Sequence, residues 1–112
     1  MSKSSERAAA ARNRKLDPLR RPLDGDAQRD VANRLKTARG HIDSILTQLD
    51  ERAYVIDVLR QLAAVRGALD AAARVSVRQY FQTAFVNAVK AGQEELAIDE
   101  MMRALTFLRH LD

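Results

Sequence analysis

The chain has 112 residues, a net charge of +4 and no cysteine, so one domain is expected, and disulfides, thiolate metal sites and thiol redox chemistry are excluded. Hydrophobic residues make up 46% of the sequence but aromatic residues only 4%, so leucine, valine, isoleucine and alanine must form the core of an all-α fold. No apolar run resembles a signal peptide or a membrane span, and we therefore expect a cytoplasmic protein.

The positive charge is concentrated at the start of the chain. Residues 1–21 contain seven Lys or Arg and two acids, giving +5, so residues 22–112 sum to −1. Such a segment either contacts a polyanion such as DNA through salt-sensitive phosphate interactions or is a solvated extension that aids solubility. Charge alone does not decide between these interpretations. The candidate DNA contacts in this segment are Arg12, Arg14, Lys15, Arg20 and Arg21.

Residues 1–25 are predicted to form a basic tail and linker, and residues 26–112 a helical domain. A short helix is possible before Lys15, but Pro18 and Pro22 interrupt any further periodicity. The linker is predicted to end at the Asp-Gly-Asp turn of residues 24–26.

A first helix is predicted over residues 27–50, with Asp26 as its N-cap. Apolar residues recur along it at spacings of three and four, which indicates one buried face. These are Val31, Leu35, Ala38, Ile42, Ile45 and Leu49. The opposite face carries Arg29, Arg34, Lys36 and Arg39, which the pattern alone assigns to an ordinary solvated surface. A tight turn at residues 50–52 then predicts an antiparallel hairpin with the next helix.

The longest predicted helix covers residues 54–89, which contain no proline and one glycine. It would be about 54 Å long, whereas a compact domain of this size has a radius of gyration of only about 13 Å. One subunit cannot cover such a helix, and its apolar positions step by three and four like a seam between helices. The chain is therefore predicted to oligomerise.

A third helix is predicted over residues 94–111, after Gly92, which is suited to end the preceding helix in the left-handed conformation. Acidic residues gather in its first turns and basic residues in its last, as the helix dipole favours. Its apolar side is predicted to cap the bundle, giving a three-helix subunit with a long central helix.

The run from Arg34 to Leu69 resembles a family of small all-helical bacterial repressors, the CsoR/RcnR/FrmR family. The family's first helix contains an Arg-Leu-Lys/Arg step followed by a glycine, as residues 34–36 and Gly40 do here. Its second helix begins Tyr-Cys-x-Asp-Val-Leu-x-Gln-Ile-x-Ala-Val-Arg-x-Ala-Leu, and residues 54–69 match this string almost throughout, with Val55 in place of the cysteine. Residues 98–105 are similar to the family's closing segment.

The resemblance implies an antiparallel four-helix-bundle dimer that pairs into a tetramer and binds operator double-stranded DNA without a helix-turn-helix. Matching the family's DNA-binding motif residue by residue places Arg34, Lys36 and Arg66 on the DNA-binding face. Arg39 is a further basic candidate, although the family usually has glutamate there. The resemblance also favours DNA contact by the basic tail.

The family's sensor site is where this sequence departs from the pattern. Copper-binding members use a cysteine at the start of the second helix, a histidine 25 residues later and a cysteine four residues beyond. The matching residues here are Val55, Tyr80 and Ala84, beside Tyr54. Valine and alanine offer no donor atom, tyrosine rarely binds soft metals, and no thiolate is present to react with formaldehyde or persulfide. The resemblance therefore predicts a degenerate sensor pocket with no metal and no cofactor.

Two interpretations of this pocket remain open. In the first, which we favour from the sequence, it is repacked as plain core and the protein has no effector. In the second, it accepts a small non-metal organic effector. His41 and His110 are too few for a metal site unless they meet across subunits, which we do not expect.

Other functions were weighed against a DNA-binding repressor. A protein that coats DNA without sequence preference would depend more on the tail. A helical enzyme similar to chorismate mutase is a further alternative, because residues 39–43 loosely resemble that family's first helix. Such an enzyme needs several inward-facing Arg and Lys residues to hold a dicarboxylate, and the central helix supplies none. We therefore do not predict an enzyme.

Overall fold

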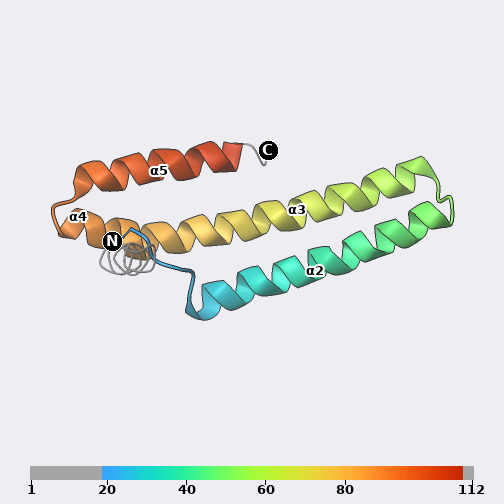
Figure 1. Cartoon of the computed structure of the whole chain (residues 1–112), viewed down its shortest axis with the longest axis horizontal. Coiled ribbons are helices and arrows are strands. Elements are labelled where there is room, and N and C mark those ends of the chain that lie inside the picture. Colours follow the sequence, from blue (N-terminus) through green and yellow to red (C-terminus); the bar gives the residue numbers. More distant parts are fainter. Residues whose placement is uncertain (1–18, 110–112) are drawn as a thin grey trace, which may run out of the picture.

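The computed structural model describes residues 19–109, and its regular structure over this range is entirely helical (Figure 1). The all-α class and the three-helix subunit with a long central helix are confirmed. The short helix considered before Lys15, the tail residues Arg12 and Arg14, and the predicted end of the last helix at residues 110–111 lie outside the described residues.

Helix α2, Gly25–Asp50, begins two residues earlier than predicted. Gly25 adopts a positive φ of 56°, so the residue before it, Asp24, is the N-cap in extended conformation, and its carbonyl accepts the N–H of Gln28 at 3.2 Å. The prediction that Asp26 is the N-cap is therefore wrong. Asp26 instead lies in the first turn, where it forms an ion pair with Arg29.

A short turn connects α2 to α3, Val55–Tyr80, as the sequence predicts. Arg52 has a φ of 55°, and the N–H of Ala53 donates to the carbonyl of Gln48 at 2.9 Å, which closes the end of α2. Tyr54 is the N-cap of α3, with its carbonyl accepting the N–H of Asp57 at 3.0 Å. Helices α2 and α3 lie antiparallel along their length (Figure 1).

The central helix continues from α3 through a π-helical turn, η1 at Phe81–Phe85, into α4 at Val86–Lys90. The three segments have 26, 5 and 5 residues, which corresponds to about 54 Å at the α-helical rise and agrees with the longest dimension of 55 Å. The radius of gyration, 18.9 Å, exceeds the value of about 13 Å for a compact domain of this size. The predicted long helix is confirmed, but its π-helical turn was not predicted.

Helix α5, Glu94–Arg109, folds back beside α4 and the end of α3, so that the central helix lies between α2 and α5 (Figure 1). Gly92 has a φ of 78°, and the next N–H, of Gln93, donates to the carbonyl of Ala88 at 2.9 Å. The prediction that Gly92 ends the central helix is confirmed.

The described residues form two separate small cores. Ala38, Ile45 and Val65 are buried between α2 and α3, with Val58 and Ala68 packed against them. At the other end, Leu19, Ala88 and Ala97 form a second core against which Tyr80 and Phe85 pack. Leu19 belongs to the linker before α2, so the linker is part of the folded structure.

Large apolar side chains remain exposed along the α2–α3 hairpin. Leu46 is 56% exposed, Leu59 53% and Leu62 48%. At about 100° per residue, these residues lie on one side of the hairpin, turned away from the Ala38 and Val65 core by a sixth to a third of a turn. A single chain thus leaves an apolar face uncovered. None of the helices within residues 19–109 has the length and apolar character required to cross a membrane.

Candidate functional site

The basic residue Arg34 lies at the groove between α2 and α3. It borders a hollow of about 260 Å³ together with Asn33, Thr37 and Ala68. Its Nε atom donates to Oδ1 of Asp30 at 2.7 Å, and both side chains are more than 40% exposed. Surface ion pairs of this kind contribute at most about 1 kcal/mol, so a phosphate can compete for Arg34.

The other predicted DNA contacts of the helices are exposed but do not surround Arg34. Lys36 lies about 160° around α2 from buried Ala38 and therefore points away from α3. Arg39, three residues further on, lies within about 60° of Lys36. Arg66 is two residues from Ala68 and hence about 160° around α3 from the Arg34 hollow. One subunit therefore presents these four cations on different faces.

The cations that precede α2 divide into two groups. Arg20 and Arg21 are exposed on the linker, and Arg12, Arg14 and Lys15 lie outside the described residues. Arg21 lines a pocket beside the end of α3, and the linker that carries it lies at the far end of the molecule from the α2–α3 turn (Figure 1).

The four residues of the predicted degenerate sensor pocket occupy two distant places in one subunit. Tyr54 and Val55 lie at the α2–α3 turn and are 68% and 65% exposed. Tyr80 lies 25 residues along the helix from Val55, or about 37 Å at the α-helical rise. Tyr80 and Ala84 are therefore close to each other but cannot contact Tyr54 or Val55 of the same chain.

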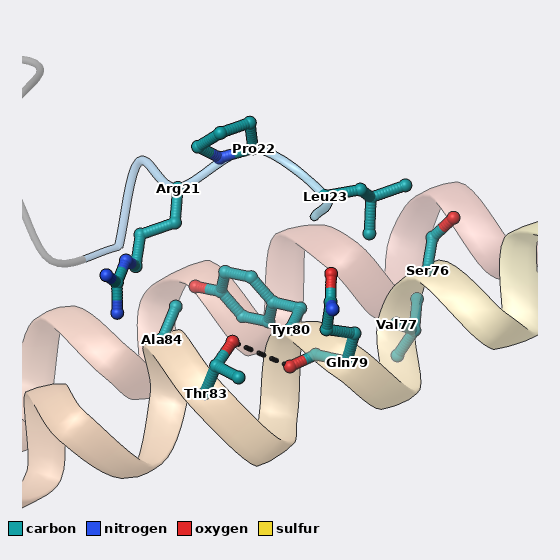
Figure 2. A pocket seen from close by; sticks show the side chains of 9 residues that line it. All are labelled: Arg21, Pro22, Leu23, Ser76, Val77, Gln79, Tyr80, Thr83 and Ala84. Carbon is teal, nitrogen blue, oxygen red and sulfur yellow. Dashed lines mark hydrogen bonds between the residues drawn. The ribbon is translucent and has the colours of Figure 1, made fainter. Parts of the chain in front are cut away.

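Tyr80 and Ala84 instead line a pocket of about 270 Å³ that is covered by the linker before α2 (Figure 2). We call residues 19–24 the strap. The strap contributes three lining residues and the central helix contributes six. They are Arg21, Pro22, Leu23, Ser76, Val77, Gln79, Tyr80, Thr83 and Ala84.

The strap is anchored at both of its ends. Leu19 is only 6% exposed and packs with Ala88 and Ala97. At the other end, the N–H of Asp24 donates to Oε1 of Gln79 at 3.2 Å, and Nε2 of Gln79 donates to the carbonyl and to Oδ1 of Asp24, both at 3.0 Å. Pro22 between the anchors restricts the backbone to an extended conformation. The sequence predicts only a linker here, although Leu19 and Leu23, four residues apart, are a signal that the segment could pack.

The floor of the pocket is the π-helical turn and the helical turn before it. Ala84 is fully buried, and the Tyr80 and Phe81 rings pack edge to face with centroids 5.9 Å apart. The hydroxyl of Thr83 donates to the carbonyl of Gln79 at 2.8 Å (Figure 2), and that of Ser76 donates to the carbonyl of Ala72 at 2.8 Å. The Ser76 and Thr83 hydroxyls of the lining are therefore engaged by helix carbonyls.

Comparison with known proteins identifies the family. A sequence model described as "Metal-sensitive transcriptional repressor" matches residues 27–106, which is most of the chain. This chain belongs to that family. The copper-sensing transcriptional repressor CsoR of Mycobacterium ulcerans is 45% identical over 82 residues, covering 73% of this chain and 70% of that protein. CsoR of Mycobacterium tuberculosis is 41% identical over 80 residues, covering 71% and 67%, and CsoR of Bacillus subtilis is 29% identical over 72 residues, covering 64% and 71%.

Membership in the metal-sensitive repressor family excludes the enzyme among the functions considered from the sequence. The family consists of transcriptional repressors, which act on DNA, and not of enzymes. The similarity to chorismate mutase in residues 39–43 is therefore not supported, and the chain is not an enzyme. The resemblance noted from the sequence motifs is confirmed.

The residues that match the family's metal ligands in the sequence do not offer the donor atoms that the metal implied by the family name requires. Within residues 19–109, no three His, Cys, Asp or Glu side chains cluster closely enough to hold a metal ion. Val55 and Ala84 carry no donor atom, and the Tyr80 phenol alone is a poor ligand for copper. No step of regulation can be derived through a metal at these residues.

Proposed function

We propose that this protein is a transcriptional repressor that binds operator DNA as a tetramer and has lost the metal and thiol sensing of its relatives. The proposal rests on the family match over residues 27–106. It is supported by the exposure of all four predicted DNA contacts in this range, which are Arg34, Lys36, Arg39 and Arg66. The remaining parts of the proposal concern the assembly, the DNA contacts and the sensor.

The exposed apolar face of the hairpin supports the proposed oligomer. Soluble monomers rarely expose a continuous apolar surface of this kind, and a second copy of the chain has a face of matching length and character. Packing two α2–α3 hairpins together gives a four-helix-bundle dimer. The exposed apolar residues of α5, such as Leu96 and Phe107, are then available for pairing dimers into a tetramer.

The proposed DNA-binding surface is assembled from several subunits. Arg34, Lys36, Arg39 and Arg66 do not form one patch in a single chain. Arg39 and Arg66 lie within about 20° of Leu46 and Leu59 around their helices, so they would border the contact between the hairpins, and a symmetric tetramer repeats each of the four cations around a broad surface. Most protein–DNA hydrogen bonds go to phosphates and sugars, so such a surface is sufficient to position the protein on DNA. The cations of the tail, at residues 12, 14, 15, 20 and 21, would add sequence-independent affinity.

The proposed loss of metal sensing follows from the chemistry of Val55, Tyr80 and Ala84. In a dimer, the start of one α3 could approach the end of the other, but these three side chains would still supply no thiolate and no imidazole. Regulation by this protein then requires either no effector or a non-metal one.

A fluorescence anisotropy titration with the DNA upstream of the protein's own gene tests the proposal. The double substitution Arg34→Ala and Arg66→Ala should weaken binding at physiological salt and reduce the dependence of affinity on salt concentration, because phosphate contacts are lost. Arg60→Ala is the matched control, because Arg60 is an exposed α3 arginine outside the proposed surface. Unchanged affinity of the double variant would refute the assigned surface.

Competition with unrelated DNA separates a repressor from a DNA-coating protein. The +5 charge of residues 1–21 is the observation that favours coating, since a concentration of positive charge binds any phosphate backbone. A repressor should retain its labelled upstream DNA in the presence of excess unrelated DNA. Equal displacement by both DNAs would favour the coating function instead.

A further inference from the structure

The strap creates a binding site that the metal-sensing chemistry does not explain. We propose that the pocket beneath the strap binds a small organic monocarboxylate with an apolar body, and that Arg21 holds its carboxylate. The pocket is already formed in the single chain, because Leu19 and Asp24 anchor the strap on either side of it.

The charge of the pocket comes from one residue. Arg21 is the only charged side chain in the pocket lining, and no ion pair within the described residues involves it. Figure 2 shows its guanidinium directed toward the central helix, at the same end of the pocket as the Tyr80 hydroxyl and Ala84. A guanidinium binds a carboxylate with two parallel hydrogen bonds, which fixes the orientation of the ligand as well as its charge.

The apolar lining of the pocket determines which kind of ligand body can bind beside the carboxylate. Leu23, Val77 and the Tyr80 ring surround the space away from the guanidinium (Figure 2). The Thr83 and Ser76 hydroxyls donate to helix carbonyls, so they provide little for a sugar or a polyhydroxylated ligand to bind. A body without polar groups, such as one aromatic ring or a short branched chain, matches this lining.

The volume limits the size of the ligand. About 270 Å³ lies below the range typical of drug-sized ligands, so a single ring with a carboxylate fits and a fused ring system does not. Asp24 does not line the pocket and forms no ion pair with Arg21; Oδ1 of Asp24 instead accepts a hydrogen bond from Gln79 at 3.0 Å.

Binding at this pocket would be coupled to the basic tail, a consequence that rests on the proposed function. The strap joins the tail to α2, and a carboxylate on Arg21 would neutralise one of the cations proposed to contact DNA. A ligand that binds the docked strap also stabilises it by mass action and keeps Arg20 and Arg21 beside α3. We expect the ligand to weaken DNA binding.

Isothermal titration of the full-length protein with benzoate tests the site, with benzamide as the neutral control of the same shape. Benzoate should bind in the millimolar range or tighter, and benzamide at least about tenfold more weakly, because it lacks the charge that pairs with Arg21. The two-ring acid 1-naphthoate should bind more weakly than benzoate because of its size. Absence of benzoate binding, or equal binding of the three compounds, would overturn the proposal.

The substitution Arg21→Gln tests whether benzoate binds at the pocket beneath the strap. Because Arg21 is exposed, the variant should fold normally, and it should bind benzoate no better than benzamide. Arg29→Gln, an exposed arginine at the start of α2, is the control and should bind benzoate like the wild type. Undiminished benzoate binding by Arg21→Gln would refute the site.

DNA binding is measured on the same samples to separate the two proposals. If DNA binds and benzoate does not, the pocket proposal fails and the repressor function stands. If benzoate binds with Arg21 dependence and DNA does not bind, the pocket proposal stands and the repressor function fails.

Discussion

The two ends of the long central helix are built differently. At the hairpin end, α2 and α3 bury few residues between them, while Leu46, Leu59 and Val55 are each more than half exposed. At the strap end, Ala84, Ala88 and Ala97 are fully buried within the single chain. The difference indicates that the hairpin requires a second chain for its stability, whereas the strap end completes its own core.

The size of the side chains explains this difference. Alanines at the α4–α5 contact allow the helix backbones to approach closely, and Leu19 of the strap fills the space that remains. On the hairpin, the larger leucines are arranged on one side, where no element of the same chain can cover them. Four predictions test this comparison.

The largest effect is expected from charges on the apolar face of the hairpin. The double substitution Leu46→Glu and Leu59→Glu should abolish the tetramer, because burying each leucine at an interface contributes about 1.5–3 kcal/mol and a buried carboxylate is unfavourable. Light scattering should show a mass no larger than that of a dimer, because the proposed α5 contacts join at most two chains once the hairpin contact is lost.

The matched control for this experiment is Ala64→Glu, on the opposite side of α3 from Leu62. Ala64 is exposed, and it should tolerate the charge without loss of mass. A wild-type protein that is already monomeric at micromolar concentration would contradict the distinction between the two ends.

An intermediate effect is expected from overpacking the strap end. Ala88→Leu should lower the free energy of unfolding by about 1–3 kcal/mol, because Ala88 is fully buried and the surrounding side chains leave no space for three more carbons. Calorimetry should show a lower Tm for the variant. The loss should not depend on protein concentration, since this core is complete in one chain.

Ala64→Leu is the control substitution at an exposed alanine and should leave Tm nearly unchanged. A destabilisation by Ala88→Leu that disappears at high protein concentration would show that the strap end, like the hairpin, depends on assembly.

A smaller effect is expected from releasing one anchor of the strap. Gln79→Ala removes three hydrogen bonds to Asp24, and exposed bonds of this kind together contribute about 1 kcal/mol. Hydrogen exchange should become faster at the strap amides while exchange in α2 and α3 remains unchanged. Gln82→Ala, at an exposed glutamine of the same helix, should not alter exchange in the strap.

The smallest effect is expected at the Arg34 ion pair. Asp30→Ala should change the free energy of unfolding by no more than about 0.5 kcal/mol, because the pair with Arg34 is exposed. If Arg34 contacts DNA, removing its carboxylate partner should strengthen DNA binding, as measured by anisotropy. Weaker DNA binding by this variant would argue against a phosphate contact at Arg34.

Most of the fold could be predicted because helix periodicity is a local property. Apolar spacing placed the hairpin, Gly92 marked the end of the central helix, and the long proline-free run predicted a helix that one chain cannot cover. The N-cap was misplaced by two residues, because two aspartates flank Gly25 and only the positive φ of that glycine selects Asp24. The π-helical turn has no signal in the spacing of Phe81–Phe85 that distinguishes it from an α-helix.

The candidate site could be predicted only in part. The sequence identified Tyr80 and Ala84 as a pair and predicted that they do not bind a metal, because alanine has no donor atom and a phenol is a poor ligand for a soft metal. It did not indicate that the strap covers a pocket at Tyr80 and Ala84. Nor did it indicate that Tyr54 and Val55 are exposed at the opposite end of the central helix. The sequence also did not show which of the four helix cations lie on the same face, because Arg34, Lys36, Arg39 and Arg66 point in different directions around two helices.

The sequence by itself determined the all-α class, the central helix, the family and the absence of thiolate chemistry, since each depends on residue types at fixed spacings. Only the tertiary structure decided the role of the linker. Leu19 and Asp24 are anchored by Ala97 and Gln79, residues more than fifty positions away in the chain. Contacts of this range depend on how the helices pack, and they convert a proline-containing linker into one wall of a pocket.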